Sequence, residues 1–391
     1  MKKPKFRVFR GLKKKTEGQY DAFLFNIILI LLCFGLVMCF SASAPSAKQV
    51  MGDSYYYFRK QLIVAIMGFV GMLFVMRIDY HKLAKKVVLF LGITVVLLLV
   101  VLAFPEQNGG RRWINIGISF QPSELAKFTV ILWLACSLSS RKHKWHKATD
   151  TKTFVRYFFK DFFPYLLFLG LFAGLLMLEP HFSCTMLIFG VGIIMLFVAG
   201  INTGYLATIA APVAAGVIWL VSFGYRSDRI TSWLDPFANP RGDGWQIIQS
   251  LYAIGSGGMF GVGLGQSRQK FLWLPEPYND FIFAVLCEEL GFVGGAAVII
   301  LFALLIWRGI TIAQRAPDLL GTLLAVGITA LIALQVLINI AVVTGTIPVT
   351  GMPLPFFSSG GTALIFTMAE MGVLLNISKQ GSIVAAEKTE V

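Results

Sequence analysis

The chain has 391 residues, of which 57% are hydrophobic and only 14% are charged, and its formal net charge is +14. A soluble protein needs more surface charge than this, so the composition excludes an ordinary soluble enzyme and indicates a protein embedded in lipid. The positive charge does not indicate nucleic-acid binding, because Lys and Arg gather in short segments between apolar runs. The five cysteines lie in or beside these runs without metal-site or disulfide spacing, and we interpret them as packing residues.

Apolar runs of about 20 residues recur along the chain, each long enough to cross a hydrocarbon core of about 30 Å. The sequence therefore predicts an all-α integral membrane protein of about ten transmembrane helices. The expected spans are 22–44, 59–77, 86–104, 122–139, 162–178, 182–200, 204–223, 281–306, 318–342 and 361–377. They form one membrane domain, 21–378, between a basic tail, 1–20, and a second tail, 379–391.

Four basic segments indicate the orientation of the spans in the membrane. They are 2–15, 77–86, 141–160 and 308–315. They fall on one side of the predicted topology, which makes that side cytoplasmic and puts both termini there. The outer face then receives 105–121, 179–181, 224–280 and 343–360. The long extracellular loop, 224–280, lies between the seventh and eighth helices.

Two outer segments cannot be regular membrane spans. The apolar stretch 247–264 contains five glycines, which predicts a re-entrant or interfacial element instead of a spanning helix. The segment 344–362 contains too many Gly and Pro residues for a continuous helix, so we expect a shaped loop. Its Ser358 and Ser359 could bind sugar hydroxyls, although hydrogen bonds to backbone are the favoured alternative.

Asp280 stands where the long outer loop meets an apolar helix. One interpretation is a helix N-cap, since a carboxylate there can accept backbone N–H bonds. The other is a general base whose pKa is raised by apolar surroundings and restrained by nearby Arg or Lys. Glu288 and Glu289 follow about two helical turns later, and at least one of them should face the bundle interior.

A second group of charged residues surrounds the outer start of the fourth span. Arg111 and Arg112 could hold a pyrophosphate through bidentate guanidinium contacts. Glu124 and Lys127 are three residues apart after Pro122, so a structural ion pair at a helix start is the main alternative to substrate binding. The long loop adds Arg226, Arg229, Arg241, Arg268 and Lys270. This outer positive charge favours an anionic ligand, with anchoring to anionic lipid head groups as the alternative.

Several separated motifs are similar to those of the shape, elongation, division and sporulation (SEDS) family, over about residues 20–378. The segments 229–236 and 351–353 resemble the FtsW branch more than the RodA branch, and SpoVE is a further relative. The motifs are Arg111-Arg112-Trp113, Gln121-Pro122-Ser123-Glu124, Asp235-Pro236, Gly244-Trp245-Gln246-Ile247-Ile248-Gln249-Ser250, Leu274-Pro275-Glu276, Asp280-Phe281-Ile282-Phe283, Glu288-Glu289-Leu290-Gly291, Asn339 and Pro348 to Gly361.

The resemblance implies a peptidoglycan glycosyltransferase that polymerises lipid II at the outer face of a bacterial cytoplasmic membrane, at the division septum. Its implied partners are a class B penicillin-binding protein and other divisome membrane proteins. Asp280 falls on the family's essential aspartate, the expected base on the acceptor sugar hydroxyl. The candidate substrate-binding residues are Arg111, Arg112, Glu124, Lys127, Arg226, Arg229, Gln249, Ser250, Arg268, Lys270, Glu289 and Ser358.

The chemistry of this reaction fits the residues without a covalent nucleophile. Lipid II carries an activated pyrophosphate, so acceptor deprotonation, orientation and charge stabilisation suffice. Arginines or a divalent cation, Mg or Mn, could stabilise the leaving group, and no protein metal-ligand cluster is expected. One departure from the family pattern is Glu179-Pro180-His181, where relatives usually carry an acidic residue after the proline.

Two other functions remain open at this stage. A lipid II flippase would need polar groups at the bilayer midplane and a path to both faces, whereas the distinctive charges here gather on one side. A noncatalytic scaffold for division enzymes would use Asp280 only for folding. A closed inner half of the bundle would weigh against transport.

Overall fold

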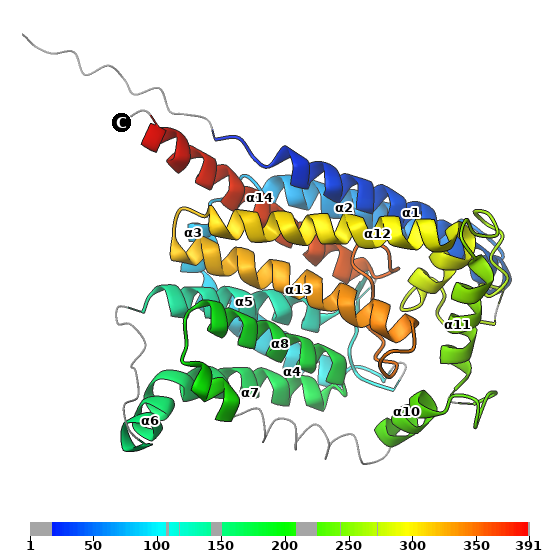
Figure 1. Ribbon diagram of the computed structural model, residues 1–391, viewed down its shortest axis with the longest axis horizontal. Helices are drawn as coiled ribbons and strands as arrows, with labels where there is room; N and C mark the ends of the chain where they lie inside the picture. The colour runs from blue at the N-terminus through cyan, green and yellow to red at the C-terminus, as the bar shows by residue number, and fades with distance from the viewer. Residues whose placement is uncertain are drawn as a thin grey trace, which may run out of the picture.

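The structure is a computed structural model that describes residues 18–106, 109–116, 118–141, 151–208, 225–242, 244–271 and 273–389. Its long helices lie side by side and form a bundle with two ends (Figure 1). The helices are α1 (Ala22–Met51), α2 (Tyr56–Val75), α3 (Tyr80–Lys85), α4 (Val87–Val100), α5 (Pro122–Ser139), α6 (Thr151–Tyr157), α7 (Phe163–Leu178), α8 (Phe182–Val198), α10 (Tyr225–Leu234), α11 (Trp245–Gly257), α12 (Ile282–Gln314), α13 (Leu319–Val343) and α14 (Gly361–Thr389).

Most of the expected apolar runs form helices in the structure. Among the described residues, six helices are long and apolar enough to cross a membrane, and α8 and the helical stretch 87–103 are shorter apolar helices. The helix α5 has the same bounds as the expected fourth span. The expected seventh span, 204–223, lies outside the described residues from residue 209 onward.

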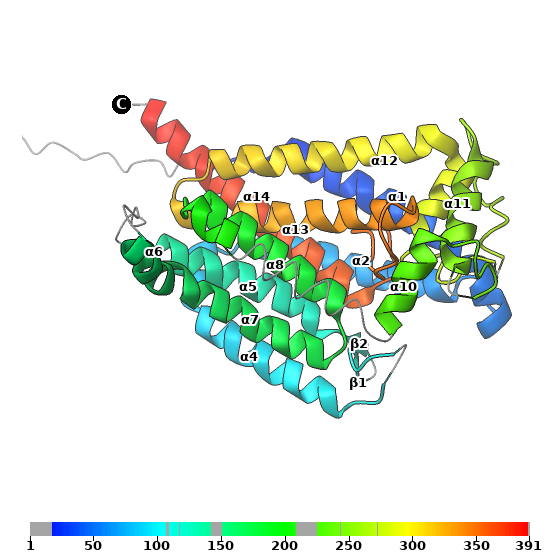
Figure 2. The same cartoon turned by 60° about the horizontal axis from the view of Figure 1, so that its bottom comes forward.

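The structure adds one short β-hairpin to the predicted helices. Strands β1 (Ile114–Ile116) and β2 (Ile118–Phe120) pair antiparallel between α4 and α5. The hairpin lies at the same end of the bundle as α10 (Figure 2). The hydroxyl of Thr362, in the first turn of α14, donates to the Ser119 carbonyl at 2.9 Å, which fixes the hairpin to the bundle.

The helix α13 is at the centre of the bundle, where it contacts α5, α8 and α12. Small residues permit these close contacts, as is usual between membrane helices. A Cβ added at Gly327 would lie 2.6 Å from the side chain of Ile131 in α5 and 2.8 Å from that of Met195 in α8. The helix α14 packs along α2. The buried side of α13 is mostly apolar, with Thr329, Gln335 and Asn339 as its polar members.

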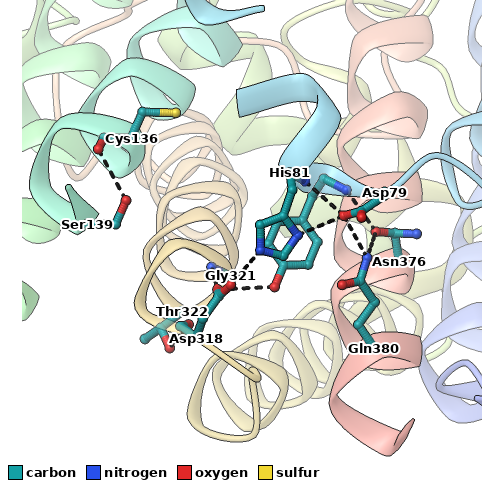
Figure 3. A network of polar contacts seen from close by, with 10 residues as sticks. Asp79, His81, Cys136, Ser139, Asp318, Gly321, Thr322, Asn376 and Gln380 are labelled. Carbon is teal, nitrogen blue, oxygen red and sulfur yellow. Dashed lines mark hydrogen bonds and ion pairs between the residues drawn. The ribbon is translucent and has the colours of Figure 1, made fainter. Parts of the chain in front are cut away.

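The α3 end of the bundle, opposite the hairpin, is joined by a polar network (Figure 3). Asp79 caps α3, and Asp318 caps α13 by accepting from the Gly321 N–H at 2.7 Å. His81 bridges the two carboxylates, with Nδ1 2.8 Å from Asp79 and Nε2 2.6 Å from Asp318. Gln380 of α14 also donates to Asp79, at 3.0 Å. Three elements that are distant in sequence therefore meet here.

Candidate functional site

Asp280 lies two residues before α12 and is partly exposed. It does not cap the helix, because the N-cap of α12 is Phe281 and no side-chain cap bond is made there. Its backbone is held from α13, where the Asn339 amide donates to the Asp280 carbonyl at 2.8 Å and to the Met352 carbonyl at 2.7 Å. One side chain thus fixes both the loop before α12 and the loop 344–360.

The loop 344–360 folds over Asp280 without helical structure, as its Gly and Pro content predicts. The Ser358 hydroxyl donates to the Asn279 carbonyl and accepts from the Leu354 N–H, each at 2.7 Å. A Cβ added at Gly351 would lie 3.3 Å from an Asp280 carboxylate oxygen, and the φ of this glycine is +69°. The favoured assignment of Ser358 to backbone bonding is therefore confirmed.

Charged groups of opposite sign surround Asp280. Burial raises the pKa of Asp280 to about 6, the nearby Glu276 carboxylate acts in the same direction, and Arg229 and Arg112 oppose it. Arg229, on α10, donates to the Val349 carbonyl at 2.8 Å, so α10 and the loop 344–360 position it. Such a carboxylate is ionised at neutral pH yet more basic than a fully solvated one, which suits proton abstraction.

The two adjacent arginines of the hairpin segment point to different places. Arg112 donates to the main-chain carbonyl oxygens of Glu179 at 3.3 Å and Pro180 at 2.5 Å, in the turn between α7 and α8. Arg111 is exposed and donates to the Leu102 carbonyl at 2.9 Å. Arg112 is therefore near enough to act on Asp280, whereas Arg111 is directed to a different part of the chain.

Glu124 and Lys127 form the predicted ion pair in α5, with 2.8 Å between Glu124 Oε2 and Lys127 Nζ. Pro122 opens this helix, as predicted. Both side chains are buried, so the pair is far stronger than a surface contact of the same length. Glu370 of α14 is buried and close enough to act electrostatically on Lys127.

Lys270 and Glu289 belong to a second polar cluster, together with Ser41 of α1. The Lys270 ammonium lies 2.7 Å from Glu289 and 3.1 Å from the Ser41 hydroxyl. Glu288 accepts from the Ser267 hydroxyl at 2.5 Å and from the Arg268 N–H at 2.9 Å. Both glutamates are buried, whereas the sequence predicted that at least one would face the bundle interior. Their hydrogen bonds hold the outer loop against the start of α12.

The other candidate residues occupy different positions around this end of the bundle. Ser250 is buried on α11 and donates to the Val343 carbonyl at 2.7 Å, which joins α11 to α13. Gln249, beside it, is also buried. Arg268 is exposed and lines a cavity of about 410 Å³. Arg226 lies on α10, but its side chain lies outside the described residues.

Four polar residues at or near the site were not among the sequence-based candidates. Asn339 was noted only as part of a motif, although it fixes the Asp280 backbone. Glu179 and His181, which were noted in the sequence only as a departure from the family pattern, and Glu370 also lie at this end of the bundle. Ionisable residues within or beside apolar runs could have indicated them. Among the described residues, no group of three His, Cys, Asp or Glu side chains is placed to hold a metal ion.

Comparisons with known proteins show the family to which the chain belongs. The family model described as "Cell cycle protein", for FtsW, RodA and SpoVE, matches residues 21–383. Stage V sporulation protein E of Bacillus subtilis is 44% identical, covering 94% of this chain and 98% of the relative. The probable peptidoglycan glycosyltransferase FtsW of a Geobacter species is 41% identical, covering 93% and 98%.

Solved structures are similar over the same length. A chain of a peptidoglycan synthase complex that coordinates polymerisation and crosslinking has a TM-score of 0.73 and 27% identity, covering 93% of this chain and 98% of that one. The rod shape determining protein RodA of Thermus thermophilus has a TM-score of 0.66 and 26% identity, covering 92% and 96%. The chain belongs to the FtsW, RodA and SpoVE family of cell cycle proteins, the SEDS family.

Proposed function

We propose that this chain is a peptidoglycan glycosyltransferase that polymerises lipid II at the outer face of the cytoplasmic membrane, with Asp280 as its general base. The supporting observation is Asp280, a partly exposed residue whose carboxyl pKa is raised to about 6 between Glu276 and two arginines. The glycosyltransferase names of relatives that are 41% and 39% identical support the same reaction.

The proposed topology has ten spans, both termini in the cytoplasm, and the long loop 224–280 outside. The basic segments 77–86 and 308–315 lie at the α3 end, and Asp280 lies at the other end. Positive charge is enriched on the cytoplasmic side of membrane proteins, which supports this orientation. Asp280 would then face the compartment where glycan strands grow.

In the proposed mechanism Asp280 removes the proton of the acceptor sugar hydroxyl, whose oxygen attacks the anomeric carbon of the donor. The bond from that carbon to the pyrophosphate oxygen breaks, and the pyrophosphate leaves with the electron pair. Arg112 and Arg229 act electrostatically at Asp280, so they are suitably placed for the developing phosphate charge.

A divalent cation could share this charge stabilisation. Mg²⁺ is commonly held by substrate phosphates and only one or two carboxylates, and Asp280 and Glu276 are the carboxylates at this site. Chelation followed by addition of Mg²⁺ or Mn²⁺ tests the contribution. If polymerisation is lost on chelation and restored by the added cation, the reaction requires the cation. If polymerisation is unchanged by chelation, the charge stabilisation is assigned to the arginines.

The proposed partner is a class B penicillin-binding protein, with other divisome membrane proteins at the septum. The similar chain in a synthase complex that couples polymerisation to crosslinking supports such a pairing. A fluorescent fusion of the full chain tests the septal position. Co-purification with the penicillin-binding protein tests the pairing.

A flippase is the second candidate, but the inner half of the bundle does not favour it. The buried residues Leu323, Leu324 and Ile328 of α13 are apolar in that half, and the His81 network joins the helices beyond them. A transporter needs a polar path through this region. The described inner half therefore supports chemistry at one face over transport.

Asp280→Asn is the test of the proposed base. We expect the purified variant, with its penicillin-binding partner, to fold and bind lipid II but to form glycan at least about 100-fold more slowly. Glycan length and amount on gels measure the effect, with the exposed Glu106→Gln as control. Equal polymer from Asp280→Asn and the unchanged chain would refute the assignment and favour a scaffold.

A further inference from the structure

Unpartnered polar atoms are concentrated around Asp280. In the described part of the chain, 12 buried side-chain N or O atoms have no hydrogen-bond partner, and nine of them belong to residues at this end of the bundle. Ser43 and Gln269 adjoin the Lys270 cluster in sequence, and the other residues are Ser123, Glu179, His181, Asn279, Asn339 and Thr350. Protein interiors seldom leave such atoms unpaired, so this end of the bundle offers hydrogen-bond donors and acceptors to a polar ligand or to ordered water.

Glu179 is the clearest case among these residues. It is fully buried, and neither of its carboxyl oxygens has a partner. The Nδ1 atom of His181, two residues later, also has none. Between them Pro180 has a φ of +30°, a strained value for proline, while Arg112 holds the turn through its main-chain carbonyls. The turn is thus held in a conformation that local preference disfavours.

Both side chains are uncharged at neutral pH. Burial raises the pKa of Glu179 to about 8, against the opposing effect of Arg112. Burial lowers the pKa of His181 to about 3, and the charges of Arg112 and Lys127 act in the same direction. A neutral carboxylic acid and a neutral imidazole each offer one proton to donate and at least one acceptor.

We propose that Glu179 and His181 form a subsite that binds a hydroxyl or acetamido group of the saccharide part of the substrate. This inference rests on the proposed glycosyltransferase function and specifies how that site recognises its sugar. A hydroxyl or acetamide both donates and accepts hydrogen bonds, as this pair does, whereas a phosphate offers these two groups only acceptors.

Arg112 connects this subsite to the proposed base. Its charge acts on Asp280, Glu179 and His181, so the three side chains lie within electrostatic reach of one guanidinium group. The pyrophosphate binds on the Arg112 and Arg229 side, and the sugar binds on the Glu179 side.

Equilibrium binding to the Asp280→Asn chain tests the subsite without turnover. The two probes are lipid II and undecaprenyl pyrophosphate, which lacks the saccharide. We expect Glu179→Ala to weaken lipid II binding about tenfold, the effect of one or two lost hydrogen bonds, and to leave undecaprenyl pyrophosphate binding unchanged. Glu179→Gln keeps a donor and an acceptor and should bind both as before, as should the exposed control Glu106→Ala.

Unchanged lipid II binding by Glu179→Ala, or equal weakening of both probes, would overturn the subsite. If Glu179→Ala fails to fold, the test becomes the pH dependence of lipid II binding by the Asp280→Asn chain, in which Glu179 is unchanged. Its lipid II binding should weaken above about pH 8 as the carboxyl ionises, and Glu179→Gln should remove this weakening. Identical pH profiles would equally overturn it. Absence of polymerisation by the unchanged chain would refute only the proposed function, because the binding comparison does not depend on turnover.

Discussion

The basicity of Asp280 is set by groups from different parts of the chain. Burial and Glu276 raise its pKa, and Arg229 and Arg112 lower it, with a resulting value of about 6. A general base works best when its pKa lies near the working pH, because it must be ionised and still hold a proton well. Removal of one neighbour should therefore shift the pH dependence of the reaction before it abolishes the reaction.

We expect the pH profile of kcat/KM for glycan formation to fall below about pH 6, because protonation removes the base. Glu276→Gln removes a like charge and should move this limb to lower pH. Arg229→Gln removes an opposite charge and should move it to higher pH. Shifts in the same direction for the two variants, or no shift for either, would contradict the assignment of Asp280 as the titrating base.

The buried pair of Glu124 and Lys127 provides a second prediction at this scale. Lys127→Met would leave the buried Glu124 carboxylate without its cation. Removal of one partner of a buried pair typically costs about 3–5 kcal/mol of folding stability. We expect a marked loss of thermal stability in detergent. The double variant Lys127→Met, Glu124→Gln should recover part of it, and equal melting of single and double variants would show that the pair is not coupled.

At the scale of elements, α12 is interrupted where the outer loop meets it. Gly291 has a φ of +67° inside the helix, and the freed backbone groups pair with the segment 258–263. The Phe292 N–H donates to the Gly258 carbonyl at 2.9 Å, and the Gly263 N–H donates to the Glu289 carbonyl at 3.0 Å. A broken membrane helix is stable only when such groups find partners, so these bonds hold the outer loop beside α12.

Gly291→Ala should strongly destabilise this junction. A Cβ there would lie 2.4 Å from the Gly261 backbone nitrogen, and the positive φ strains any L residue. Gly255→Ala is the matched control, since Gly255 lies in α11 with no atom within 4 Å of its added Cβ, and alanine favours helix by about 1 kcal/mol. Folded yield and thermal stability measure both variants. Equal behaviour of the two would refute the close approach.

Hydropathy was sufficient to predict most elements, but not their long-range contacts. The bounds of α5, α7 and α8 follow the apolar runs because each run must match the thickness of the membrane. The contact between Ser41 and Glu289 joins residues 248 positions apart, and nothing local in the sequence indicates it. The hairpin at 114–120 is likewise too short for a period-two pattern to be recognised.

Some residues of the candidate site could likewise be identified from the sequence, and others could not. Asp280 and the pair of Glu124 and Lys127 could be identified because charge stands beside apolar runs or at helical spacing. The divergence of Arg111 from Arg112 could not, because it depends on where the α7–α8 turn lies relative to the hairpin. The unpartnered oxygens of Glu179 became visible only when its neighbours in space were known.

Across the whole molecule, the two ends use polar groups differently. Around Asp280 many buried polar atoms are unpartnered, whereas His81, Asp79 and Asp318 at the α3 end satisfy one another. Burial alone would lower the pKa of His81, but its hydrogen bonds and the charges of both aspartates outweigh this and raise it. The α3 end therefore provides a fixed, pH-sensitive connection between α3 and α13, with Gln380 joining α14.

The stabilisation by this network should depend on pH through His81. Because its folded pKa is raised above 6.5, its contribution is complete below pH 6.5 and is lost as pH rises through the folded value. Asp79 has a lowered pKa, so its contribution is lost only in acid, and Tyr80, whose pKa is raised, stays protonated. Asp318→Asn keeps an acceptor that can cap α13 but removes the charge facing His81. We expect the difference in Tm between the unchanged chain and Asp318→Asn to be largest near pH 6 and to shrink toward pH 9, and a constant difference would show that His81 does not titrate against Asp318.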